Sequence, residues 1–469
     1  MPRFLIPLIS VLLLFPSIAL SNPTSRESFE WDGTKITKFI GNETDVVIPD
    51  GTTAIGKEAF MKCDSLKSVV IPEGVKAIGD WAFLYCDSLK TVVIPKSVKR
   101  IGAGAFSDCT SLTAVTIPEG VKVIRRTTFS NCQAMKSVVI PKSVTKIKKN
   151  AFDTCSSLKT IEIPEGVTEI GEFTFRFCCS LTSVTIPQGV TVIEIGTFSS
   201  CDSLKSVVIP KSVTKIDEGA FRECHSLTAV TIPEGVTEVR QEAFAGCASL
   251  TSVEIADSVK EIGPGVFTEC PALEKWIISS THPYFKTDGT ALLTKDGKTL
   301  VACRNSTEKY RIPEGVKEIG GCAFDSCDSL TSVEIPDSVE VIEWRAFEGC
   351  IALTSVTIPD GVKEIGSYAF SCCRSLTSIV IPKGVKVIEF SAFEWCTSLK
   401  TVVISEGTTT IEFHAFEKCE SLTSVEIPAS VTEINWKAFN DCPNLTIHVP
   451  KGSEAERLAR WYNIPFQTK

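Results

Sequence analysis

Histidine is scarce in this 469-residue chain, and its 48 Lys and Arg are outnumbered by 56 Asp and Glu. There are only four histidines, and they are widely scattered: His225, His282, His414 and His448. Histidine is the usual general base near neutral pH and a common zinc ligand, so this scarcity argues against a histidine-based catalytic or metal site. The formal net charge is −8. An acidic balance argues against nucleic acid as a partner, because DNA and RNA are bound by clustered Lys and Arg.

Long hydrophobic runs are also missing. The apolar stretch at residues 4–15 contains Pro7 and is shorter than the roughly 20 residues that a membrane-spanning helix needs. It follows Arg3 and precedes Ala19-Leu20-Ser21, which is typical of a secretory signal peptide cleaved after Ser21. We therefore expect the mature chain, with a net charge of −9, to be secreted or held at the cell surface without an integral membrane segment.

What the chain does contain is 20 cysteines and a repeat that explains their positions. Phenylalanine recurs every 23 residues from Phe60 to Phe267 and again from Phe324 to Phe439. Each of these 16 phenylalanines is followed three residues later by Cys and, except at Met135, six residues later by Leu. The unit reads L-x-x-V-x-I-P-x-x-V-x-x-I-x-x-x-A-F-x-x-C. Such a regular period indicates one structural unit stacked many times.

The repeat has the pattern of a short strand followed by a turn. Val69 and Ile71 are expected to point inward on either side of Val70, which is the period of a β-strand. Pro72 ends that strand, and Val75 and Ile78 bring a second short segment back to the core. One coil has too little interior to be stable alone, so neighbouring coils must share a continuous apolar column. The pattern predicts a solenoid with a ladder of parallel strands, mostly β and irregular coil.

Over roughly residues 46–450, this unit resembles the BspA-type leucine-rich repeat of surface proteins from host-associated bacteria and some protozoa. It departs from the commoner leucine-rich pattern in having Pro after the strand and Cys before the Leu. The resemblance implies an α/β-type repeat solenoid, right-handed and leucine-rich-repeat-like, with a short terminal helix. It also implies an extracellular or cell-surface protein that adheres to or interacts with other macromolecules, without identifying the ligand.

The repeats are interrupted once and flanked by two caps. Between Phe267 and Phe324 one period carries 34 extra residues, and an Asp296-Gly297 turn signal predicts a β-hairpin from about residue 290 to 302. The pattern around Asp32-Gly33 predicts a similar cap at the N-terminus, and residues 453–462 predict a short amphipathic helix. The predicted organisation is a signal peptide (1–21), an N-terminal cap (22–45), repeat block 1 (46–278), a β-hairpin insertion (279–311), repeat block 2 (312–450) and a C-terminal cap (451–469).

Sixteen of the cysteines form one ladder. Exported proteins rich in cysteine usually contain disulfides. However, side chains that point the same way on rungs about 4.8 Å apart are wrongly angled for a disulfide, and they do not converge on a metal. We expect the ladder cysteines to be small buried hydrophobes. Outside the ladder are Cys179, Cys303, Cys322 and Cys372, and a Cys303–Cys322 disulfide is an open alternative.

One repeat position changes character along the chain. Three residues before the phenylalanine, the first ten repeats carry varied residues, whereas the later repeats carry several aromatic ones. An exposed aromatic stripe would mark a binding site, while the alternative is that the rings pack on the turn of a neighbouring coil. The candidate binding residues are Trp344, Phe390, Phe413 and Trp436, with Tyr368 one place along beside Ser367.

In a repeat ladder, each side chain lies beside a residue of the same type on the next coil. Catalysis instead needs side chains of different chemistry that converge in one pocket. We therefore expect no enzyme and no cofactor. The leading hypothesis is a monomeric secreted or cell-surface protein that binds extracellular proteins or glycans through an extended face. Two alternatives stay open: a structural surface-coat component that assembles through its ends, and a secreted carbohydrate-binding protein that uses the aromatic stripe.

Overall fold

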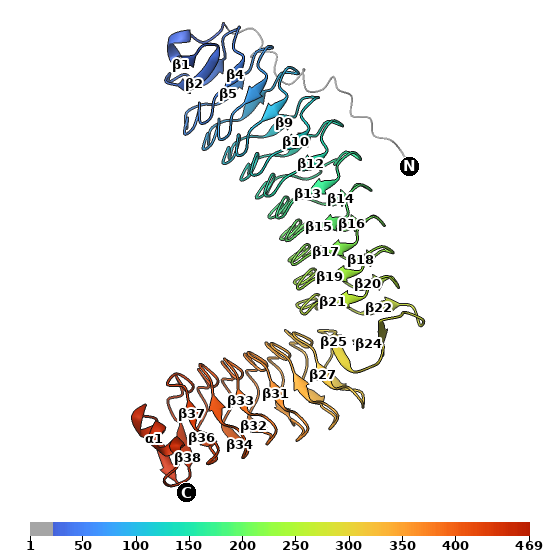
Figure 1. Ribbon diagram of the computed structural model, residues 1–469, viewed down its shortest axis with the longest axis vertical. Coiled ribbons are helices and arrows are strands. Elements are labelled where there is room, and N and C mark those ends of the chain that lie inside the picture. Colours follow the sequence, from blue (N-terminus) through green and yellow to red (C-terminus); the bar gives the residue numbers. More distant parts are fainter. Residues whose placement is uncertain (1–21) are drawn as a thin grey trace. The chain divides into compact units, whose positions relative to one another are not determined.

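The computed structural model describes residues 22–469, so the predicted signal peptide at residues 1–21 lies outside the described residues. The chain divides into two compact units. Unit 1 ends at Ser212, and unit 2 comprises Val213–Lys469. Each unit is a parallel β-solenoid built almost wholly of short strands and coil (Figure 1). The predicted fold class is thereby confirmed.

Each coil contains two short strands joined by tight turns. In the first strand of a typical coil Val69 is buried and Val70 is partly exposed, and Ile71, which directly follows the strand, is buried again. This confirms the predicted alternation. Val75 and Ile78 are fully buried on the return segment. Equivalent strands of successive coils then pair in parallel and in register.

Unit 1 contains seven strands of each kind after its cap. Its first strands are β3 (Asp45–Val47), β5 (Ser68–Val70), β7 (Thr91–Val93), β9 (Ala114–Thr116), β11 (Ser137–Val139), β14 (Ser183–Thr185) and β16 (Ser206–Val208). Its second strands are β4 (Ala54–Ile55), β6 (Ala77–Ile78), β8 (Arg100–Ile101), β10 (Val123–Ile124), β12 (Lys146–Ile147), β13 (Glu169–Ile170) and β15 (Val192–Ile193).

A hairpin closes the start of unit 1. After a short 3-10 turn, η1 (Arg26–Ser28), strands β1 (Phe29–Asp32) and β2 (Lys35–Phe39) pair antiparallel, and β2 then pairs in parallel with β4. Gly33, with φ of +61°, supplies the left-handed turn between them. Phe39 stacks on Phe60 at 5.1 Å and so covers the first ring of the phenylalanine ladder.

Unit 2 continues the same architecture. Its first strands are β18 (Ala229–Ile232), β20 (Ser252–Ile255), β22 (Lys275–Ile278), β26 (Lys309–Arg311), β28 (Ser332–Glu334), β30 (Ser355–Val356), β32 (Ser378–Ile381), β34 (Thr401–Ile404), β36 (Ser424–Glu426) and β38 (Thr446–Val449). Its second strands are β17 (Lys215–Ile216), β19 (Glu238–Val239), β21 (Glu261–Ile262), β27 (Glu318–Ile319), β29 (Val341–Ile342), β31 (Glu364–Ile365), β33 (Val387–Ile388), β35 (Thr410–Ile411) and β37 (Glu433–Ile434).

The insertion folds in the same way as the N-terminal cap. Strands β23 (Phe285–Thr287), β24 (Ala291–Thr294) and β25 (Thr299–Cys303) pair antiparallel, which confirms the hairpin predicted for residues 290–302. Strand β25 also pairs in parallel with β27, so it is the second strand of a coil as well as part of the hairpin. A continuous hydrophobic cluster begins at Ala291 and extends to Ala459. The domain boundaries placed around the insertion stay a prediction.

The C-terminal end is closed by helix α1 (Glu454–Trp461) and by β39 (Phe466–Thr468), which pairs in parallel with β38. The Ser453 hydroxyl caps the helix by accepting a hydrogen bond from the Glu456 amide. Ala455, Leu458 and Ala459 are buried. Within residues 22–469, no helix is both long and apolar enough to cross a membrane.

Two ladders fill the interior of each unit. In unit 1 the rings from Phe60 to Phe198 stack with centroids 4.7–5.6 Å apart. Beside them, each ladder thiol from Cys86 to Cys201 donates to the phenylalanine carbonyl oxygen of the preceding coil at 3.0–3.4 Å. The cysteines thus fill the core as predicted and also satisfy a backbone acceptor, a role that the spacing of the cysteines does not indicate.

The Cys303–Cys322 disulfide is not present, so that alternative is wrong. All 20 cysteines are free thiols. The Cys303 thiol donates to Thr307 Oγ1 at 3.8 Å, whereas the Cys322 side chain packs against the turn at Gly265. The two side chains are therefore held by different neighbours.

Candidate functional site

The five predicted binding residues lie on the turns that follow second strands of unit 2. Phe390 and Phe413 come two residues after β33 and β35. The amide of Tyr368 donates to the carbonyl of Phe390 at 3.0 Å, and the amide of Ser391 donates to the carbonyl of Phe413 at 3.0 Å. Backbone hydrogen bonds therefore hold these turns in one column, which we call the aromatic column and which consists of Trp344, Tyr368, Phe390, Phe413 and Trp436.

The aromatic column is partly exposed to solvent. Phe390, Phe413 and Trp436 are 37%, 38% and 57% exposed, whereas Trp344 and Tyr368 are half-buried. The packing alternative therefore does not describe the whole column. Exposure by itself leaves the binding role of these residues a prediction.

Ring contacts join the middle of the column. The Tyr368 and Phe390 rings meet edge to face at 5.3 Å. The His414 ring lies 5.6 Å from Phe390 and 5.9 Å from Phe413. Sequence reasoning missed His414, although it occupies the same repeat position as Tyr368, two residues before the ladder phenylalanine. Its Nδ1 faces the carboxylate of Glu417.

The two tryptophans at the ends of the column behave differently. A Cβ on Gly321 would lie 2.7 Å from Trp344 Nε1, so the indole covers the turn of the preceding coil. Trp344 therefore fits the packing alternative. Trp436 projects into solvent, and the Lys437 ammonium group lies 4.7 Å from its ring centroid.

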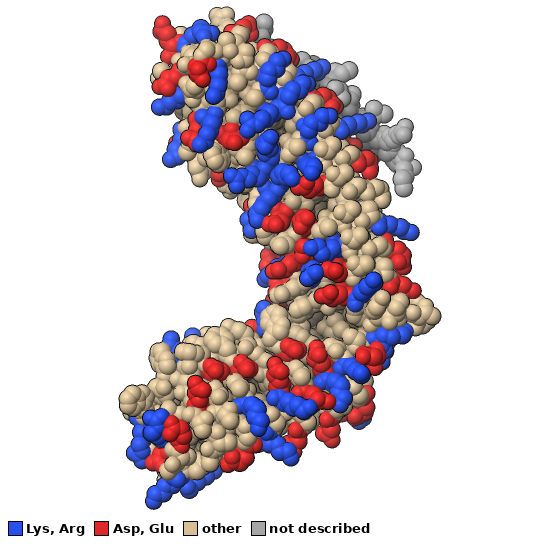
Figure 2. Space-filling view, in the orientation of Figure 1, with Lys and Arg blue, Asp and Glu red and all other residues tan. Residues whose placement is uncertain are grey.

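An acidic row accompanies the aromatic column. Glu389 and Glu412 directly precede Phe390 and Phe413. Burial, followed by repulsion from Glu412 and Glu364, raises the pKa of Glu389 above its usual value. On the face seen in Figure 2, Lys and Arg side chains gather over the N-terminal coils, whereas acidic and basic side chains are mixed over the C-terminal ones.

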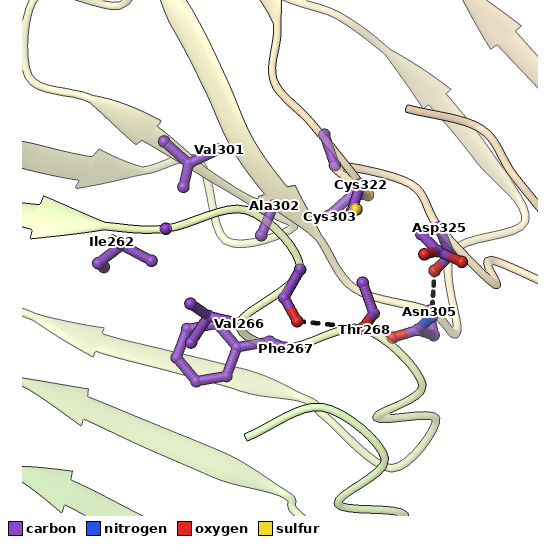
Figure 3. A pocket seen from close by; sticks show the side chains of 13 residues that line it. Ile262, Val266, Phe267, Thr268, Val301, Ala302, Cys303, Asn305, Cys322 and Asp325 are labelled. Atoms are coloured by element: carbon purple, nitrogen blue, oxygen red, sulfur yellow. Dashed lines mark hydrogen bonds between the residues drawn. The ribbon is translucent and has the colours of Figure 1, made fainter. Parts of the chain in front are cut away.

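A second candidate is the pocket where the repeats of unit 2 meet the insertion (Figure 3). It lies between Phe267 on one side and Cys303 and Cys322 on the other. Burial raises the pKa of the nearby Asp325 carboxyl to about 7, against a hydrogen bond from Ser326 and the Arg345 charge. The pocket volume of about 10 Å³ holds at most one water molecule, so no substrate fits.

Metal binding has no structural support in the described part of the chain. Residues 22–469 contain no group of three or more His, Cys, Asp or Glu side chains placed to hold a metal ion. A larger hollow of about 180 Å³ lies between the insertion hairpin and residues 313–315, and Lys286, Asp288 and Asp296 help to line it. Unit 2 therefore offers this hollow as well as the exposed aromatic column.

Comparison with protein families identifies the repeat. Residues 38–158, 122–224, 196–288 and 317–446 match the model of the BspA type leucine-rich repeat region. The chain belongs to the BspA-type leucine-rich-repeat family. Proteins of this family are cell-surface or secreted, and the family and its solenoid fold are typically non-enzymatic. The family suggests a non-catalytic, surface or host-interacting role.

Several solved structures are similar to this chain. A leucine-rich cell surface protein from Faecalibacterium prausnitzii is 30% identical, with 94% of this chain and 97% of that chain covered and a TM-score of 0.45. A leucine-rich repeat protein from Bacteroides ovatus is 27% identical, with 96% and 97% covered and a TM-score of 0.48. The pneumococcal vaccine antigen PcpA is 16% identical, with 96% and 98% covered and a TM-score of 0.51, and supports the fold alone. The comparison with curated proteins gave no match.

Proposed function

We propose that the chain is an exported, non-catalytic protein that binds extracellular proteins or glycans through the aromatic column. The observation that carries this proposal is the exposure of Phe390, Phe413 and Trp436 on three successive coils. Aromatic side chains are enriched among the residues that dominate binding energy. A row of exposed rings on a regular scaffold suits an extended partner, in a role such as adhesion. The signal-peptide pattern of residues 1–21 supports the extracellular location.

The carbohydrate-binding alternative has one observation in its favour. Glu389 and Glu412 place carboxylate groups next to the exposed Phe390 and Phe413 rings. Aromatic faces can stack on sugar rings, and carboxylates accept hydrogen bonds from sugar hydroxyls. A glycan is therefore the second candidate partner of the same column.

The surface-coat alternative is less well supported. The hairpin β1–β2 closes the first coil of unit 1, and α1 with β39 closes the last coil of unit 2. Capping repeats prevent solenoids from stacking end to end. The caps therefore favour a monomer.

The test is a binding screen of residues 22–469 against immobilised matrix proteins, including fibronectin and fibrinogen, and a glycan panel. We expect saturable binding that weakens at least tenfold in the triple variant Phe390→Ala, Phe413→Ala, Trp436→Ala. The matched control removes three aromatic residues that are similarly exposed elsewhere, with Tyr85→Ala, Phe177→Ala and Trp461→Ala. Equal loss in both variants, or no binding by the folded protein, contradicts the proposal.

A further inference from the structure

One segment of this acidic chain is strongly basic. Residues 76–149 contain 13 Lys and Arg residues and only four Asp and Glu residues, a net charge of +9 in a chain of −8. Figure 2 shows the Lys and Arg side chains gathered over the N-terminal coils. This concentration is local, so arguments from overall charge do not apply to it.

The solenoid brings these cations onto one surface. The register of β10 and β12 pairs Val123 with Lys146. Continuing that register sets Arg125 beside Lys148 and Arg126 beside Lys149. We call the set that flanks strands β6, β8, β10 and β12 the basic surface; its members are Lys76, Lys99, Arg100, Lys122, Arg125, Arg126, Lys146, Lys148 and Lys149.

Carboxylates neutralise only the margins of the basic surface. Arg100 pairs with Asp80 at 3.0 Å, Lys146 and Lys148 share Glu169, and Lys149 pairs with Glu172. Lys122, Arg125 and Arg126 lie between these pairs, and all three side chains are exposed. Within residues 22–469 no ion pair is recorded for these three. The centre of the surface therefore carries uncompensated positive charge.

The basic surface is not a property that the repeat itself requires. After the insertion, six of the twelve positions equivalent to Arg100, Arg125 and Lys146 carry glutamate and none carries Lys or Arg. The glutamates are Glu318, Glu343, Glu364, Glu389, Glu412 and Glu433. The fold therefore accepts either sign of charge at these positions.

We propose that the basic surface binds a linear sulfated polysaccharide. The cations follow neighbouring coils, whose parallel strands are about 4.8 Å apart, so a linear polyanion can meet them in succession. Surfaces that bind single-stranded nucleic acid interleave aromatic rings among the cations. Here the rings of Trp81 and Phe173 stand only at the two ends of the surface, where Lys149 Nζ lies 5.3 Å from the Phe173 ring centroid. The equivalent positions between them carry Gly104, Thr127 and Asn150, so no ring is interleaved among the central cations. The choice of a polysaccharide rests on the proposed extracellular location, and the site is independent of the aromatic column.

The experiment measures the affinity of residues 22–469 for heparin, used as the sulfated probe, over a range of salt concentrations. We expect the affinity to fall linearly with salt on logarithmic axes. The triple variant Lys122→Gln, Arg125→Gln, Arg126→Gln should bind at least tenfold more weakly. The matched control, Lys67→Gln, Lys90→Gln, Lys136→Gln, removes the same charge from exposed lysines beside the first strands of unit 1 and should stay within twofold.

Further arms separate the possible partners. Desulfated heparin should not bind, and duplex DNA should bind at least tenfold more weakly than heparin. Equal loss in the two charge variants, or equal affinity for DNA, overturns the proposal. A third result would also overturn the proposal: light scattering shows that the wild type is a dimer, and the triple variant is a monomer that binds heparin as well as the wild type does. That result assigns the surface to a second copy of the chain. The aromatic-column variant should retain full heparin affinity, so failure of one proposal is distinguishable from failure of the other.

Discussion

Asp153 and Asp325 occupy the same repeat position, but the arginine of the next coil holds the two carboxylates differently. Asp153 and Asp325 each follow a ladder phenylalanine, and both are buried. Asp153 accepts hydrogen bonds from Arg176 Nε at 3.1 Å and Nη2 at 2.9 Å. Asp325 lies 3.7 Å from Arg345 Nη2, and the Nε of that arginine is engaged by Glu348. Burial accordingly raises the pKa of Asp325 to about 7.

The substitution Asp325→Asn is expected to raise the free energy of unfolding at pH 8 by roughly 1–3 kcal/mol. The folded pKa of Asp325 lies above the unfolded value of about 3.9, so the unfolded chain releases its proton first as the pH rises. In the wild type, the ionisation of Asp325 makes the free energy of unfolding fall as the pH rises from about 4 to about 7. The variant lacks this pH-dependent fall. Urea unfolding at pH 4.5 and pH 8 measures both effects.

Asp153→Asn is the matched control for this substitution. It breaks two charge-assisted hydrogen bonds, so it is expected to lower the free energy of unfolding at pH 8 by roughly 1–3 kcal/mol. If both substitutions lowered the free energy of unfolding by the same amount, the neighbours of Asp325 would stabilise its charged form as well as Arg176 stabilises that of Asp153.

Most coils hold non-glycine residues in the left-handed backbone region at two positions, two residues before and two residues after the ladder phenylalanine. Lys62, with φ of 60°, is one of these residues. Glycine stands at the equivalent Gly246 and Gly349, whose φ values are also positive. A side chain in this region costs about 1–2 kcal/mol.

Lys62→Gly should therefore raise the free energy of unfolding by about 1 kcal/mol. The control is Lys67→Gly in the same coil, an exposed lysine outside the left-handed region, which should lower it by roughly 0.5–1 kcal/mol. Urea unfolding of the two variants at one pH decides the matter. A loss of stability in Lys62→Gly contradicts the strain argument.

The repeating elements were largely predictable, because residues that are 23 positions apart lie in the same ladder. Val69, Ile71 and the phenylalanine ladder are buried as their spacing indicates. The role of β25 was not predictable, because its parallel pairing with β27 joins Thr299 to Glu318 through backbone hydrogen bonds that no side-chain pattern encodes.

In the aromatic column, the exposure of a side chain could not be predicted from its repeat position alone. Trp344 and Trp436 occupy one repeat position, so the sequence assigns them the same environment. Trp344 is nevertheless half-buried, because Gly321 on the preceding coil leaves room for the indole, whereas the equivalent neighbour of Trp436 is the bulky Phe413. Exposure depends on the neighbouring coil as well as on the position.

Two phenylalanines in the same part of unit 2 test the difference between the ladder and the column. Phe370→Ala opens a cavity in the stack between Phe347 and Phe393, so we expect a loss of about 3–5 kcal/mol in the free energy of unfolding. Phe390→Ala removes a ring that is 37% exposed and should cost less than about 1 kcal/mol. Denaturant unfolding measures both, and equal losses would contradict the assignment of Phe390 to the surface.

Across the whole molecule, the family repeat leaves the surface positions free to vary in charge. Lys and Arg are concentrated in residues 76–149, whereas the coils after the insertion carry glutamate at half of the positions equivalent to Arg100, Arg125 and Lys146. Because salt screens such surface charge over about 10 Å at 0.1 M, heparin binding should be salt-sensitive. Binding through the aromatic column should depend on salt much less. The two proposed surfaces can therefore be told apart in one titration.

The ladder of thiols should make the whole chain sensitive to alkaline pH. Burial raises the pKa of most of the fully buried ladder thiols, for example to about 12 at Cys155, whereas an unfolded cysteine titrates at about 8.5. The stabilising effect of the neutral buried thiols is complete below the unfolded pKa and is lost as the pH rises towards the folded one. Sixteen of the 20 cysteines are buried, so the free energy of unfolding should fall steeply between about pH 8.5 and pH 11.

Urea unfolding at pH 7.5 and pH 10, in the presence of a reductant, measures this loss, and ultraviolet thiolate absorbance followed in the same samples assigns its cause. At pH 10 the thiolate signal should rise together with the unfolding transition, because the buried thiols ionise only when the chain opens. At pH 7.5 no such rise is expected. Tyrosine also titrates at about pH 10, and tyrosinate absorbs in the same ultraviolet region as thiolate. Its contribution is therefore measured at the longer-wavelength tyrosinate band, where thiolate does not absorb, and subtracted. A native chain that already shows the full thiolate absorbance at pH 10 would mean that the ladder thiols are not held neutral by burial.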